Sequence, residues 1–133
     1  MKTLLTVLLC WSLPLIGADK KPLTKEESAK VIEAAIRKVA KKPAGELTKA
    51  DLEKVTVLEL YQNQLTDVKG LEKLTQLEGL YLSINQLADV KGLENLTQLE
   101  RLFLDDNPDL TKAQIAELQK ALSKCEISHD AKR

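Results

Sequence analysis

Aromatic side chains are scarce in this chain: one Trp, two Tyr and one Phe make up 3% of its 133 residues. Any hydrophobic core must therefore be built from aliphatic residues. With one His and two Cys, the sequence disfavours a zinc site held by several such ligands. Five Gly and four Pro are too few for a collagen-like chain or a flexible linker. We expect no metal and no cofactor.

The chain also lacks an excess of charge of either sign, with 20 Lys and Arg against 20 Asp and Glu. A basic surface for nucleic acid is therefore not expected. The charges are unevenly placed: residues 19–54 hold 10 basic and 7 acidic residues, residues 55–110 hold 4 and 10, and residues 111–133 hold 5 and 3. The acidic middle is either ordinary solvated surface or a field that steers a basic partner onto it. The sequence leaves both interpretations open.

The first 18 residues, MKTLLTVLLCWSLPLIGA, have the pattern of a secretory signal peptide. Lys2 provides the positive start, residues 4–16 are mostly apolar, and cleavage is expected after Ala18. A transmembrane helix needs about 20 apolar residues, so this stretch is too short to remain as an anchor. A lipid anchor on Cys10 is disfavoured, because bulky leucines precede it. We expect an exported protein, secreted or periplasmic, with no membrane attachment after cleavage.

A repeat dominates the middle of the chain. The stretches VTVLELYQNQL, LEGLYLSINQL and LERLFLDDNPDL begin 22 residues apart, at Val55, Leu77 and Leu99. This spacing resembles the leucine-rich repeat signature L-x-x-L-x-L-x-x-N-x-L, in its short 22-residue class. The resemblance implies an α/β solenoid with a short, parallel, concave sheet, and it implies a function in binding proteins.

Each repeat position has an expected role. Alternating strand leucines share one face and point inward, namely Leu58, Leu60, Leu80, Leu82, Leu102 and Leu104. The chain then returns along the convex side through Val68, Leu71, Leu74, Val90, Leu93 and Leu96, with Gly70 and Gly92 permitting the bends. The resemblance implies that the amides of Asn63, Asn85 and Asn107 hydrogen-bond the backbone of the turns as a ladder of structural residues.

Residues 19–54 are expected to form an N-terminal helical cap, residues 55–110 three repeats, and residues 111–133 a C-terminal cap and tail. Capping-box patterns begin at Thr24, Thr48 and Thr111. The first helix is expected to run to about Lys41 and to turn one apolar face inward, formed by Val31, Ile32, Ala35, Ile36 and Val39.

At the other end, a helix with Ile115, Leu118 and Leu122 facing inward should lead into a last strand at Cys125–Ile127. Residues 19–24 and 130–133 are predicted to be loose tails. Cys125 is expected to pack in the core, since no second cysteine remains after signal cleavage.

The residues that flank the strand leucines should face solvent on the concave side: Val57, Glu59, Tyr61, Gly79, Tyr81, Ser83, Arg101, Phe103 and Asp105. Every aromatic residue of the mature chain is among these nine. Aromatic residues suit strands in general, but they also anchor partners at interfaces. We favour the second interpretation because the predicted core contains no aromatic residue. The candidate partner-binding residues are the nine without Gly79.

The sequence gives little indication of calcium binding, glycosylation or a catalytic pair. The acidic run Asp105–Asp109 lacks the ligand spacing of an EF-hand. Asn95-Leu96-Thr97 is a glycosylation sequon that matters only in a eukaryotic secretory pathway, whereas the signal and caps are typical of a bacterial protein. His129 is expected in the exposed tail, and Cys125 with His129 does not make a nucleophile–base pair.

The predicted function is therefore an exported module that binds a protein or peptide on its concave face. An enzyme is not expected, because an open repeat scaffold lacks a deep pocket. The alternative is a structural or self-assembling protein of the envelope or extracellular space. A third possibility, a regulatory subunit of a cytosolic enzyme, conflicts with the signal peptide. We expect a monomer in solution.

Overall fold

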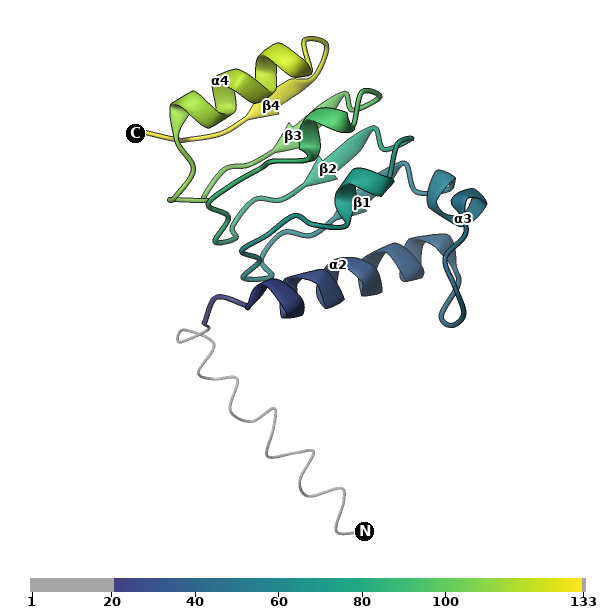
Figure 1. The fold of residues 1–133 in the computed structure, drawn as a ribbon. Helices are drawn as coiled ribbons and strands as arrows, with labels where there is room; N and C mark the ends of the chain where they lie inside the picture. The colour runs from purple at the N-terminus through teal and green to yellow at the C-terminus, as the bar shows by residue number, and fades with distance from the viewer. Residues whose placement is uncertain (1–20, 133) are drawn as a thin grey trace, which may run out of the picture.

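The repeats form successive coils, each of which contributes one strand to a parallel sheet. The computed structural model describes residues 21–132, so the predicted signal peptide lies outside the described residues. The strand order is β1-β2-β3-β4, with bounds Val57–Glu59, Gly79–Tyr81, Arg101–Phe103 and Glu126–Ser128. The helices are α2 (Lys25–Ala40), α3 (Lys49–Glu53) and α4 (Lys112–Ala121). Figure 1 shows α2 at one end of the sheet and α4 with β4 at the other.

The constant repeat length keeps the strands in register. Leu58 pairs with Leu80, Leu80 with Leu102, and Leu102 with Ile127. On the convex side, the short 3₁₀ helices η2 (Leu71–Lys73) and η3 (Leu93–Asn95) each follow a glycine with a φ of 106°. Because few residues other than Gly adopt this φ, Gly70 and Gly92 permit the bends as predicted. The predicted solenoid with a parallel sheet is confirmed.

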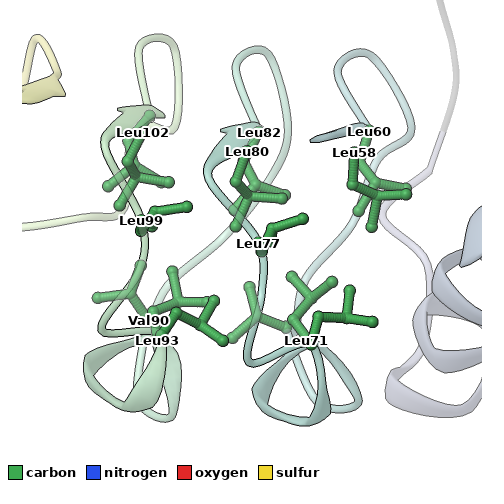
Figure 2. Close-up of a cluster of buried hydrophobic side chains, with 14 of the residues drawn as sticks. Leu58, Leu60, Leu71, Leu77, Leu80, Leu82, Val90, Leu93, Leu99 and Leu102 are labelled. Atoms are coloured by element: carbon green, nitrogen blue, oxygen red, sulfur yellow. The ribbon is translucent and has the colours of Figure 1, made fainter. Parts of the chain in front are cut away.

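The core is a column of aliphatic side chains. The six strand leucines are at most 1% exposed, and the convex-side residues predicted to point inward are buried as well. Figure 2 shows the strand leucines of successive coils in equivalent places, with Leu71, Val90 and Leu93 approaching from the 3₁₀ side. No aromatic residue belongs to the buried core of the described segment. Stacking on the neighbouring coils therefore completes the burial of each coil's leucines.

Helix α2 covers the first coil. Its predicted capping box is present, with Glu27 N–H donating to Thr24 Oγ1 and Thr24 N–H to Glu27 Oε2. The buried line along α2 is Ser28, Ile32, Ile36 and Ala40. The prediction that Val39 faces inward is wrong: it is 41% exposed. The residues of α2 that contact the coil most closely are four positions apart along the helix. Ala40 belongs to this series and faces inward, whereas Val39 lies to one side of it.

The segment before α2 is fixed to the first coil rather than loose. Leu23 N–H donates to Gln64 O at 2.9 Å, and Thr66 Oγ1 donates to Leu23 O at 2.8 Å. At the other end, Asp130 Oδ1 accepts from Asp106 N–H at 2.9 Å. The prediction of loose tails is therefore wrong at these two positions, because each bonds a turn of a neighbouring coil.

The C-terminal segment completes the third coil with a helix and adds a fourth strand to the sheet. Helix α4 packs against η3 and occupies the place that the 3₁₀ helices have in earlier coils. Ile115, Leu118 and Leu122 are buried as predicted. Cys125 is also buried, and this burial, followed by the charge of Glu126, raises the pKa of its thiol to about 11. The last strand begins at Glu126, one residue later than predicted.

Candidate binding surface

Buried asparagines hold the turns at the ends of the strands. Asn85 Oδ1 accepts from two backbone N–H groups, those of Asn63 (3.0 Å) and Leu65 (2.9 Å). Its Nδ2 donates to three carbonyl oxygens, those of Leu60 (3.0 Å), Leu82 (2.9 Å) and Ser83 (3.3 Å). Asn85 thus bonds both its own turn and the preceding coil, and this sets the spacing of the strands beneath the concave face.

The other two asparagines differ in how many coils they join. Asn107 repeats the pattern, with Nδ2 donating to Leu82 O and Leu104 O at 3.0 Å and Oδ1 accepting from Leu87 N–H at 3.1 Å. Asn63 follows the first strand, and its Nδ2 donates, among residues 21–132, only to Tyr61 O of its own turn. It is partly exposed. The three positions are therefore equivalent in sequence but unequal in their contacts.

The strand register arranges the candidate residues in columns across the sheet. One column is Val57, Gly79, Arg101 and Glu126, and the next is Glu59, Tyr81, Phe103 and Ser128. Tyr61, Ser83 and Asp105 follow these strands as a third column. Asp105 Oδ2 accepts from Ser128 Oγ at 2.7 Å, which ties the turn after β3 to β4. Glu59 and Arg101 are exposed.

Two aromatic rings stack at the centre of this face. The Tyr81 and Phe103 centroids lie 4.7 Å apart, and the ring planes differ by 12°. Both residues are partly buried rather than exposed, which corrects the prediction. The stack covers one face of each ring, since neighbouring parallel strands bring their side chains to stacking distance.

Gly79 lies beneath these side chains and is buried, although it was predicted to face solvent. A Cβ on Gly79 would lie 3.6 Å from Val57 Cγ2 and 3.8 Å from Tyr81 Cε1. The missing side chain therefore leaves room for Val57 and Tyr81 to lean over the strand. We refer to Val57, Tyr81 and Phe103, on the floor made by Gly79, as the aromatic platform.

Ile84 is an exposed residue of this region that sequence reasoning missed. It is 45% exposed, and Tyr61 nearby along the same edge is 50% exposed. Ile84 also has a φ of 58°, a conformation that β-branched residues rarely adopt. The equivalent positions in the neighbouring coils are Gln62 and Asp106, with φ of 57° and 60°. Comparing the three repeats would have identified Ile84 as the one apolar residue at this turn position.

Metal sites, membrane-spanning helices and pockets are the other functional features to consider in residues 21–132. Within that range, no three His, Cys, Asp or Glu side chains are grouped so that they could hold a metal ion. The same residues include no helix of the length and apolar character that crossing a bilayer demands. A hollow of about 670 Å³ lies between α2, α3 and the convex side of the first coil, away from the aromatic platform.

Comparison with known proteins agrees with this architecture. The family model described as Leucine Rich repeats (2 copies) matches residues 53–95 and 75–120. No match was found among curated proteins.

Several solved structures are similar to the chain. An internalin of Listeria monocytogenes is 26% identical with a TM-score of 0.66, over 77% of this chain and 31% of its own. A leucine-rich repeat protein of Leptospira interrogans is 34% identical with a TM-score of 0.52, over 62% and 22%. Internalin C2 of Listeria monocytogenes, 18% identical with a TM-score of 0.57, shares the fold over 77% and 56%. The chain thus spans less than a third of the length of the first two.

Proposed function

Because the chain belongs to the leucine-rich repeat family, whose domains generally serve as protein–protein interaction modules, we propose that it is exported and binds a protein or peptide on its concave face. The signal-like pattern of residues 1–18 supports export. The proposed role is binding and not catalysis, and it uses no cofactor. The binding residues are Val57, Glu59, Tyr61, Tyr81, Ser83, Arg101, Phe103 and Asp105, to which we add Ile84.

The observation that carries this proposal is the placement of the aromatic rings. The buried core of the described residues contains no aromatic residue, yet Tyr61, Tyr81 and Phe103 all lie in or directly after the strands. Val57, Tyr61 and Ile84 add exposed apolar surface there. Apolar surface with aromatic residues at its centre is typical of a protein-binding site.

The test is a selection of binders from a displayed library of random peptides on the protein that starts at Asp19. Tyr81→Ala and Phe103→Ala should each weaken the selected binders by about 30-fold, as expected for interface anchors of roughly 2 kcal/mol. Val39→Ala, which removes an exposed apolar side chain from α2, is the control and should leave affinity unchanged.

Thermal melts of each variant must accompany the titrations, because the partly buried rings also contribute to stability. Binders that keep full affinity for both folded alanine variants would contradict the proposed site. Light scattering at high concentration addresses the alternative of self-assembly: a concentration-dependent increase in mass would favour it over a monomeric binding module.

A further inference from the structure

We propose that the segment bound on the concave face is basic, with Lys or Arg side chains placed around an apolar side chain that rests on the aromatic platform. This inference rests on the proposed function and names the chemistry of the partner.

The charges on and beside the sheet are mostly negative. Six acidic and two basic residues lie in the four strands or within two positions of their ends: Glu59, Glu78, Glu100, Asp105, Glu126, Asp130, Arg101 and Lys124. All are exposed except Asp105, which is partly buried. The aromatic platform therefore lies within a predominantly acidic border.

These acids have no partners of opposite charge among residues 21–132. The ion pairs found there are all in the N-terminal cap, and they join Arg37 with Glu33, Lys42 with Asp51 and Lys54 with Asp51. Carboxylates without ion-pair partners around an apolar surface repel one another, and bound cationic side chains would relieve that repulsion.

The distribution of charge along the chain also favours a basic partner. Residues 55–110 carry 4 basic and 10 acidic residues, whereas both flanking segments of the mature chain are net basic. A basic segment would therefore be attracted to the repeats and repelled by the two ends. An acidic segment would meet repulsion at the platform itself.

The experiment uses displayed random peptides of about 12 residues, selected at about 50 mM NaCl, where surface charges are weakly screened. Peptides whose binding is lost on Phe103→Ala are sequenced, and the most frequent one is synthesised for titration. We expect these peptides to be enriched in Lys and Arg together with an aromatic or aliphatic residue. Raising NaCl to about 500 mM should weaken binding by about tenfold.

Matched charge variants locate the effect. The triple variant Glu59→Gln, Glu100→Gln and Glu126→Gln should weaken the synthetic peptide by about tenfold at low salt. The control triple variant Glu46→Gln, Glu53→Gln and Glu117→Gln removes the same charge from exposed positions in the two caps, and should change affinity less than about threefold. Circular dichroism confirms that both variants fold.

The outcomes separate this inference from the proposed function. Peptides that depend on Phe103 but are neutral or acidic, or that bind equally well to both triple variants, would overturn the basic partner and leave the concave site standing. If every selected peptide binds Tyr81→Ala and Phe103→Ala as well as the parent, the concave site itself is overturned. The basic partner and the concave site are both supported if basic peptides are enriched and lose affinity only for the triple variant at Glu59, Glu100 and Glu126.

Discussion

Single residues in the turns hold successive coils together by hydrogen bonds, and Asn85 is the clearest case. Its side chain makes five hydrogen bonds and is 2% exposed. Neither a hydrocarbon side chain nor water can replace these bonds, because the groups that Asn85 satisfies lie between two coils. A polar residue at this position is thus part of the core.

Asn85→Ala and Asn85→Leu should both lower the free energy of unfolding by about 3 kcal/mol or more, since each buried group left unpaired costs about 1–3 kcal/mol. Leu restores volume but no hydrogen bond, so the comparison separates hydrogen bonding from packing. Chemical denaturation measures the loss. Asn63→Ala is the matched control: it breaks one bond at a partly exposed position, and the loss should be about 1 kcal/mol. A parent-like Asn85→Leu would show that the ladder is unimportant.

Ile84 presents the opposite case, a residue that the fold itself does not favour. A left-handed backbone conformation costs an L-residue roughly 1–2 kcal/mol, and Asn tolerates it better than a β-branched residue. Ile84→Asn should therefore stabilise the protein by about 1 kcal/mol in thermal or chemical denaturation while weakening a concave-face ligand. Gln62→Asn, at the equivalent turn of the coil before, should change stability less. Loss of stability in Ile84→Asn would mean that the isoleucine packs usefully in the free protein.

Among the elements, the short helix α3 is held by a charged capping residue, Asp51. Asp51 Oδ2 accepts from three donors: Lys42 Nζ (2.8 Å), Thr48 N–H (2.8 Å) and Thr48 Oγ1 (2.9 Å). The hydrogen bond from Lys42, and then those from Thr48, hold the pKa of the Asp51 carboxyl well below its usual range. One carboxylate thus caps α3 and ties it to the loop after α2.

The lowered pKa of Asp51 makes the stability of the protein dependent on pH. Its contribution is fully present above the unfolded-state carboxyl pKa of about 3.9, and it is lost as the pH falls towards the lower pKa of the folded state. Asp51→Asn should therefore lose less stability than the parent when the pH falls from about 6 to about 3. Denaturation at both pH values tests this. Glu53→Gln, exposed on the same helix, should retain the acid dependence of the parent; equal slopes in all three proteins would rule out the role of Asp51.

At the scale of the whole molecule, the coils are stable only when both ends are covered. Each coil contacts its immediate neighbours, so its leucines are buried by the coil on either side. At β1 that neighbour is α2, and at β3 it is the last strand, β4 (Figure 1). Damage to α2 should therefore spread along the array instead of remaining local.

Ile32→Ala should lower the free energy of unfolding by about 2–5 kcal/mol, because it opens a cavity where α2 meets the first coil. Ile32 is 1% exposed, and its Cγ2 lies 3.7 Å from the place of a Cβ on Gly70. Val39→Ala, on the outer flank of the same helix, should cost about 0.5 kcal/mol or less. Hydrogen exchange should show lower protection in all strands of Ile32→Ala. Loss confined to α2, with β2 and β3 unaffected, would contradict coupling along the solenoid.

The features that the sequence alone determined are those encoded locally or by the period. Leu58 and Leu80 are buried because they recur at the same place in a 22-residue unit, and the capping box at Thr24 depends only on a residue three positions on. Tertiary structure decided what depends on a neighbouring coil. It buried Gly79 beneath Val57 and Tyr81, stacked Tyr81 on Phe103, and placed Ala40 inward where Val39 was expected. It also left Asn63 with one side-chain bond among the described residues, because β1 is the first strand there. Residues 22 apart in the chain become neighbours only when the sheet forms. The exposure of each of them depends on the size of the side chain on the next strand, which the local sequence does not indicate.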